Sequence, residues 1–179
     1  MTRDKKMEEI RQNIYNFASQ TDFSKLEVDL SDLNNLDKES RSYHQKKKTM
    51  MVKSLQEKLK NSLEQIEDIT WQTEKNLLGN AKDRVDIFGS SSEYTIILEI
   101  DTHRADQIAK KFTSRLNYFL KQESGEKGML YVIFIYPGTK KMSINETKKY
   151  IRYCKSIGEE LHISVMDFHS SDLDEKWGE

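Results

Sequence analysis

Apolar residues recur at steps of three and four in four stretches of this chain, which is the spacing of a helix with one buried side. This pattern predicts helices over residues 5–20, 46–69, 105–122 and 144–161. The longest stripe consists of Val52, Leu55, Leu59, Leu63 and Ile66. Each of these helices should therefore cover an apolar surface elsewhere in the protein.

Five shorter apolar runs predict β-strands, and turn-forming residues separate the first three of them. The runs cover residues 71–78, 84–88, 94–101, 129–136 and 162–168. The fourth run is apolar almost throughout, as expected of a strand that is covered on both faces of its sheet. Residues 21–44 are rich in Ser, Asp and Asn without a sustained period, which predicts an irregular connector.

The order of these elements predicts an α/β fold. Two helices precede three strands in a meander, and helix, strand, helix and strand follow. Connections through helices make the later strands parallel, so the sheet should be mixed and lie between two helical layers. We expect two regions, an N-terminal extension over residues 1–45, with the first helix and the connector, and a main domain over residues 46–179.

Composition restricts the class of protein without naming a partner. The chain has 179 residues, 29 Lys and Arg against 30 Asp and Glu, and a formal net charge of -1, so a nucleic acid would need a local basic patch. The single Cys154 excludes an internal disulfide and a multi-cysteine zinc site. No apolar run is long enough for a membrane span, so we expect a cytoplasmic protein without a membrane partner.

Candidate chemistry lies in the second and third strands. Glu99 and Asp101 are two residues apart and share one face of a strand, and Asp86 reaches them if the two strands pair as a hairpin. Three carboxylates at one edge repel one another unless a cation lies between them. Oxygen ligands suit Mg²⁺ or Mn²⁺, so the leading hypothesis is metal-assisted phosphodiester chemistry.

This element order, with an Asp before a Glu-x-Asp strand, resembles the PD-(D/E)XK nuclease superfamily over residues 46–168. The resemblance implies a restriction endonuclease-like three-layer α/β/α fold, with Asp86, Glu99 and the carbonyl of Ile100 as metal ligands. Asp101 would assist that metal or bind a second one. Mg²⁺ or Mn²⁺ would be the cofactor.

Asp101 departs from the family pattern, since most members have Lys there to orient the attacking water and balance charge. A replacement cation can come from the following helix, where Gln107, Lys111 and Arg115 lie on one polar stripe. Lys111 is the first candidate for the migrated lysine. Gln107 matches a glutamine found one turn into this helix in several branches of the family.

The resemblance further implies a DNA endonuclease, with a restriction or defence role by family analogy alone. We expect Arg104, Lys110, Lys111 and Arg115 to hold the DNA backbone, with the lysines of residues 46–48 as a weaker candidate beside solvated surface charge. Cleavage of both strands would need a homodimer, a partner subunit or two binding events. The helix over residues 5–20 is a candidate dimer element.

Three alternatives stay open. The missing lysine favours a catalytically decayed member of the same fold that binds nucleic acid or acts as a scaffolding subunit. A protein-interaction module built on the N-terminal helices would leave the acidic residues as surface charge. The carboxylates could also form ordinary ion pairs with Arg84, His103 or Arg104.

Overall fold

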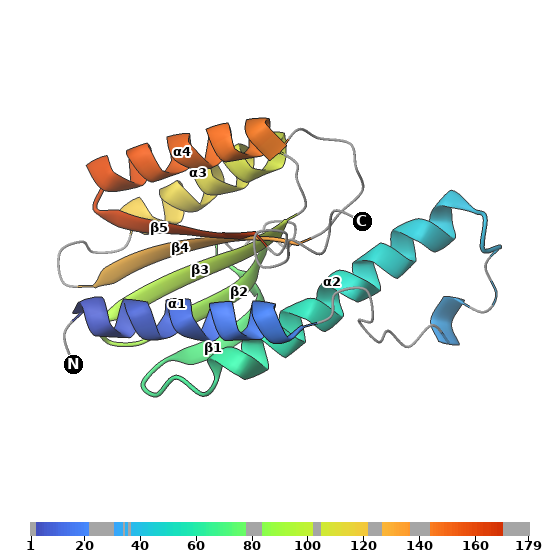
Figure 1. Cartoon of the computed structure of the whole chain (residues 1–179), viewed down its shortest axis with the longest axis horizontal. Coiled ribbons are helices and arrows are strands. Elements are labelled where there is room, and N and C mark those ends of the chain that lie inside the picture. Colours follow the sequence, from blue (N-terminus) through green and yellow to red (C-terminus); the bar gives the residue numbers. More distant parts are fainter. Residues whose placement is uncertain are drawn as a thin grey trace.

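The computed structural model describes residues 3–21, 31–33, 35, 37–77, 84–101, 105–121, 127–136 and 144–169. Within these ranges the chain forms an α/β structure with a five-stranded mixed sheet, as the sequence predicts (Figure 1). The helices are α1 (Arg3–Gln20), the 3-10 turn η2 (Ser31–Leu33), α2 (Arg41–Leu63), α3 (Ala105–Lys121) and α4 (Ile144–Glu160). The strands are β1 (Thr70–Asn76), β2 (Arg84–Ser90), β3 (Tyr94–Asp101), β4 (Gly128–Ile135) and β5 (Ile163–His169).

The largest difference from the predicted boundaries concerns α2, which begins at Arg41 rather than at residue 46 and ends at Leu63 rather than at residue 69. Ser40 caps this helix, and its hydroxyl accepts a hydrogen bond from the Tyr43 N–H at 3.1 Å. The added first turn, residues 41–45, is polar, so the spacing of apolar residues could not predict it. Within the predicted connector, residues 22–30, 34 and 36 lie outside the described residues.

The strands lie in the order β1-β2-β3-β4-β5. The first three form an antiparallel meander, and β4 and β5 continue the sheet parallel to β3. The helical crossovers α3 and α4 make these parallel steps, as the element order predicts. The carboxyl ends of β3, β4 and β5 therefore meet at one edge of the sheet, where Asp101 is in register with Ile135 and Ile135 with His169.

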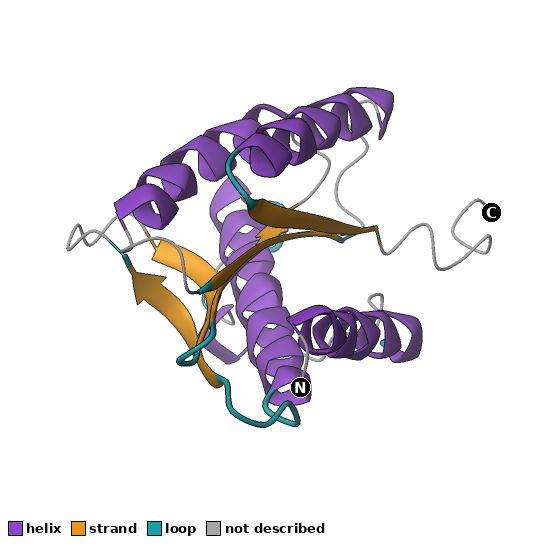
Figure 2. Ribbon diagram, turned by 90° about the vertical axis from the view of Figure 1, so that its left-hand side faces the viewer, coloured by secondary structure: helices purple, strands orange, loops and turns teal. Residues whose placement is uncertain are grey.

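Helices cover both faces of the sheet (Figure 2), and each face has its own apolar core. α1 and α2 cover one face, where Leu59 and Leu63 belong to the same buried cluster as Leu98 and Phe134 of the sheet. α3 and α4 cover the other face with residues such as Phe112. Alternation along the buried strands supplies both cores at once, which is why β3 and β4 contain so few polar residues.

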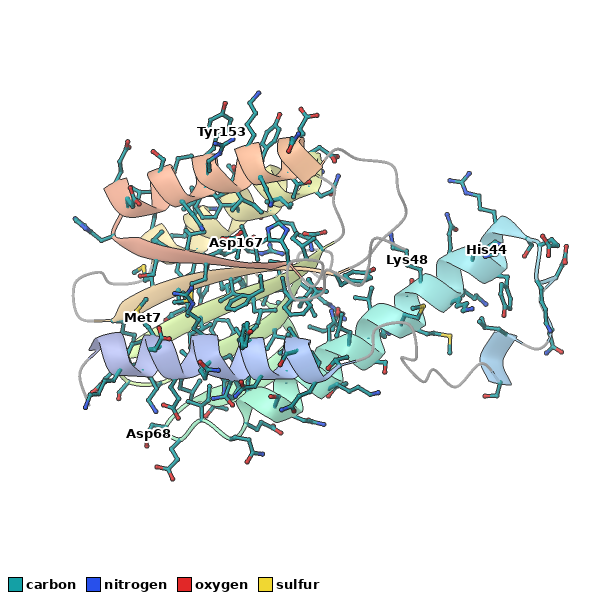
Figure 3. All side chains as sticks on the ribbon, in the orientation of Figure 1. Met7, His44, Lys48, Asp68, Tyr153 and Asp167 are labelled. Atoms are coloured by element: carbon teal, nitrogen blue, oxygen red, sulfur yellow. The ribbon has the colours of Figure 1, made fainter. Side chains whose placement is uncertain are left out.

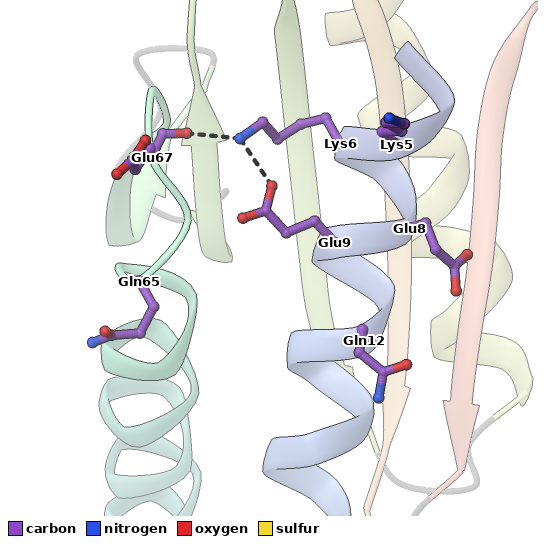
Figure 4. A pocket seen from close by; sticks show the side chains of 7 residues that line it. All are labelled: Lys5, Lys6, Glu8, Glu9, Gln12, Gln65 and Glu67. Atoms are coloured by element: carbon purple, nitrogen blue, oxygen red, sulfur yellow. Dashed lines mark hydrogen bonds and ion pairs between the residues drawn. The ribbon is translucent and has the colours of Figure 1, made fainter. Parts of the chain in front are cut away.

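The first helix belongs to this core. Ile10, Ile14 and Ala18 of α1 are buried in the same cluster as the sheet residues, so α1 is part of a helical layer rather than an extension. Its apolar stripe is thus covered by the protein's own sheet and is not a free dimer face. At its N-terminal end, the buried Lys6 donates to the Glu67 carbonyl at 3.1 Å and pairs with Glu9 at 2.9 Å (Figure 4).

Among the helices that the structure describes, none has the length and apolar character needed to cross a bilayer.

Gly89 allows one close contact that the α1/α2 core depends on. It pairs with Trp71 across β1 and β2, and a Cβ atom at this position would lie 2.6 Å from the indole ring. Such a distance is far inside ordinary van der Waals contact, and Trp71 itself is buried. The strand must therefore carry glycine here to let the indole ring lie this close to its backbone.

Gly89→Ala should destabilise the protein by about 1–3 kcal/mol, because the ring must move within a packed core. Urea unfolding followed by tryptophan fluorescence measures the change. Ser92→Ala, at an exposed position in the adjacent turn, is the control and should stay within about 0.5 kcal/mol of wild type. Equal stability of both variants would contradict the contact.

Candidate functional site

Strands β2 and β3 separate at Asp86. Their pairing runs from Ser90↔Thr95 to Ile87↔Leu98 and stops there, before Asp86 on β2 and Glu99 on β3. Val85 belongs to the α3/α4 core whereas Ile87 belongs to the α1/α2 core, although residues two apart on a regular strand share a face. β2 therefore changes its face at Asp86, as a bulged strand does. On the other side of β2, the register with β1 also omits the position of Glu74, whose φ of 53° is left-handed.

Two side chains replace the main-chain hydrogen bonds that this separation removes. The Ile100 N–H donates to Asp86 Oδ2 at 2.8 Å, and the Arg84 carbonyl accepts from the Arg115 guanidinium at 2.8 Å. Buried main-chain groups need such partners, so the divergence can exist only where suitable side chains are supplied. The opening between the strands is thus held by the same residues that form the site.

Three carboxylates converge in this opening on one ammonium group. Lys111 Nζ lies 3.0 Å from Glu99 Oε2, 3.1 Å from Asp101 Oδ2 and 3.3 Å from Asp86 Oδ2. Lys111 comes from the second turn of α3, which crosses the sheet face that Glu99 and Asp101 share. Burial by itself would lower the pKa of Lys111, but Glu99, Asp86 and Asp101 outweigh that effect and raise it, so the lysine is charged.

Glu99 is the most deeply buried charged group of the cluster, with its side chain 1% exposed. Arg115 Nε donates to Glu99 Oε1 at 2.7 Å, and the Arg115 side chain is only 4% exposed. Burial raises the pKa of Glu99 to about 7, and the neighbouring Asp86 acts in the same direction against the pull of Lys111 and Arg115. The carboxyl is therefore held between two cations and still costs free energy to ionise.

The buried Gln56 of α2 links the cluster to the opposite helical layer. Its Nε2 donates to Asp86 Oδ1 at 2.6 Å and to Glu74 Oε1 at 3.1 Å. The sequence analysis did not select Gln56 or Glu74. A signal for Gln56 was present, since it lies within the apolar stripe of α2, between Val52 and Leu59, where a polar side chain needs a buried partner.

The other predicted site residues lie in different surroundings. The Gln107 side chain donates to Asp106 Oδ2 at 2.8 Å. Lys110 is exposed on α3. Arg115 was expected to contact a DNA backbone, but it is buried against Glu99, because it falls in the stripe of Ile108, Phe112 and Phe119. Arg104 lies outside the described residues.

The donor set suits a hard cation, although Lys111 now occupies its centre. Asp86, Glu99 and Asp101 present only oxygen atoms. The Asp101 carbonyl accepts from the Tyr136 N–H on the β4 side, so the Ile100 carbonyl faces the opposite side, toward the opening beside β2. Within the described ranges, no group of three or more His, Cys, Asp or Glu side chains is arranged so that it could hold a metal ion. Metal entry would thus require the Lys111 ammonium to give up its central position.

Comparisons with protein-family models, with curated proteins and with solved structures found no match for this chain.

Arg115→Met should destabilise the protein by about 3–5 kcal/mol, because it leaves Glu99 buried beside one cation and the Arg84 carbonyl without its donor. Chemical unfolding measures the loss. Lys110→Met, at an exposed position on the same helix, should change stability by less than about 0.5 kcal/mol. Adding Glu99→Gln to Arg115→Met should recover part of the loss, and a double variant less stable than Arg115→Met would contradict this assignment.

Stability without metal should fall as pH rises from about 4.5 to about 7. Glu99 holds its proton up to about pH 7 in the folded chain and up to its ordinary pKa of 4.5 in the unfolded chain, so the folded state binds the extra proton in this interval. Glu99→Gln removes the effect. Urea unfolding in EDTA should show wild type losing stability relative to this variant across the interval, whereas a constant difference would contradict the raised pKa.

Proposed function

We propose that this protein is a divalent-metal-dependent endonuclease that hydrolyses phosphodiester bonds in DNA. One observation carries the proposal: Asp86, Glu99 and Asp101 converge on a single cation position, with Lys111 Nζ 3.0–3.3 Å from all three. The order α2-β1-β2-β3-α3-β4 and the placement of the acids on β2 and β3 support a restriction endonuclease-like core of the PD-(D/E)XK kind. Mg²⁺ or Mn²⁺ would be the cofactor.

The residues divide the chemical work among themselves. Asp86, Glu99 and the Ile100 carbonyl would hold the metal, with Asp101 beside them, and the metal when bound would activate water and stabilise charge on the phosphate. Arg115 and Gln56 fix the orientation of Glu99 and Asp86 through hydrogen bonds of 2.7 and 2.6 Å. Lys111 would supply the positive charge that Asp101 cannot supply, from a different element than usual.

A cationic helix end beside this site supports a nucleic-acid substrate. The first half of α2 extends beyond the sheet, and Figure 3 shows His44 and Lys48 on this extension. Residues 41–53 contain five Lys and Arg side chains and no acidic residue. Gln56 of the same helix donates to Asp86. The positive stretch, which ends at Lys53, therefore ends within one helical turn of the residue that contacts the carboxylates. A helix N-terminus gains nothing from positive charge, so an external anion offers a reason for this placement.

A second candidate, a catalytically decayed nucleic-acid-binding or scaffolding subunit, is favoured by the same lysine. Lys111 and Arg115 already supply the positive charge that three carboxylates need. In such a protein the cluster would be a buried ionic network that holds β2 and β3 apart. The two candidates differ in whether a divalent ion can displace the ammonium.

Supercoiled plasmid incubated with Mn²⁺ or Mg²⁺ should be nicked by wild type and not by Asp86→Asn or Glu99→Gln, with a loss of at least about a hundredfold. Lys111→Met should also lose activity but bind the metal more tightly, since the competing ammonium is gone. Lys121→Met, at an exposed position at the end of α3 and outside the expected DNA contacts, is the matched control and should retain cleavage. Agarose electrophoresis with a time course measures the nicking rate.

Thermal unfolding with added Mn²⁺ separates the two candidates when cleavage is absent. A metal-dependent rise in the unfolding midpoint that Asp86→Asn abolishes would support metal binding at the carboxylate cluster. Unchanged midpoints in wild type and in Lys111→Met, together with intact plasmid, would refute the nuclease and leave the decayed subunit.

A further inference from the structure

A second polar cluster lies at the carboxyl end of β5, on the sheet face that α4 covers. Asn145, Lys148, Arg152 and Lys155 of α4 line a pocket of about 440 Å³ together with Asp167 and His169 of β5. This volume is many times the roughly 30 Å³ that one water molecule takes up in the liquid. Among its seven lining residues, which also include Ile151, three are cations and one is an anion, so the pocket has a net positive charge.

Asp167 orders the cationic side of this pocket. Lys155 Nζ lies 2.5 Å from Asp167 Oδ1, and His169 Nε2 lies 3.0 Å from Asp167 Oδ2. The hydrogen bond from His169 leads the contributions that lower the pKa of Asp167 to about 2, with Lys155 adding to it against partial burial. Both carboxylate oxygens therefore have partners, and Asn145, Lys148 and Arg152 line the rest of the pocket.

The sheet register places this pocket next to the carboxylate site. Glu99 is in register with Ile133, and Ile133 with Asp167. In the same way, Asp101 is in register with Ile135, and Ile135 with His169. In-register residues of parallel strands share a face, and neighbouring strands lie about 4.8 Å apart. The two clusters are therefore about 10 Å apart on one face, a separation that nearby phosphates of one nucleic-acid strand can span.

We propose that the pocket between α4 and β5 binds a phosphate group of a nucleic-acid strand, a few nucleotides away from the group held at the carboxylate cluster. The three cations and the Asn145 amide have hydrogen-bond donors that suit phosphate oxygens. The planar guanidinium of Arg152 can donate two parallel hydrogen bonds to one phosphate. The identity of the ligand rests on the proposed function. The pocket itself, with its charge and its ordered lining, does not.

The test compares Lys148→Gln/Arg152→Gln with Lys149→Gln. Lys149 lies on the same helix, but its ammonium lies 5.9 Å from the ring centroid of Tyr153, and Figure 3 shows Tyr153 on the side of α4 that faces away from the sheet. Binding of a fluorescent duplex oligonucleotide is measured by anisotropy in EDTA, so that cleavage plays no part. The double variant should bind about tenfold more weakly than wild type, and the slope of log K against log salt should shrink by about 1. Lys149→Gln should stay near wild type.

Inorganic phosphate provides the second arm, with the His169 imidazole resonances in NMR spectra as the readout. Phosphate should shift them in wild type and in Lys149→Gln but not in the double variant, and their dispersion also reports that each variant is folded. Shifts without a selective loss of oligonucleotide binding would overturn the strand assignment and leave a free-phosphate site.

Unchanged His169 resonances together with equal binding losses in both variants would overturn the pocket altogether. Neither arm uses metal or cleavage. Both can therefore test the pocket even if the carboxylate cluster proves to have no nuclease activity.

Discussion

The structure depends on how the buried Glu99 carboxylate is compensated. Its side chain is 1% exposed, and such a group survives in a core only between cations or with its proton retained. Arg115 and Lys111, one turn apart on α3, supply two cations from the same helix face. This requirement sets the rotation of α3 over the sheet, and with it the position of every side chain that faces the carboxylates.

The separation of β2 from β3 follows from the same network. Asp86 takes the Ile100 N–H and Arg115 takes the Arg84 carbonyl, so the main-chain groups that leave the ladder remain bonded. A regular hairpin would have closed this space. The site therefore exists because side chains carry the hydrogen bonds that β2 and β3 give up, and its chemistry and its fold cannot be altered independently.

One edge of the molecule gathers the features that bear on function. The carboxyl ends of the parallel strands bring the acidic cluster and the pocket at α4 and β5 onto a common face, and the basic half of α2 extends from the same side (Figure 1). Under the proposed function, the positive flanks would supply affinity for a polyanion at several points and the acidic centre would supply the chemistry at one.

The sequence by itself determined the elements and their order, because helical and strand periodicities are local and the crossovers through helices force parallel pairing. It also placed Glu99 and Asp101 on one face and selected Lys111 as the cation to accompany them. Only the tertiary structure decided that Arg115 points inward to Glu99, that Gln56 joins Asp86 to Glu74, and that α1 completes a core layer. Those facts depend on how helices rotate against the sheet and where two strands part, which are contacts between residues far apart in the chain.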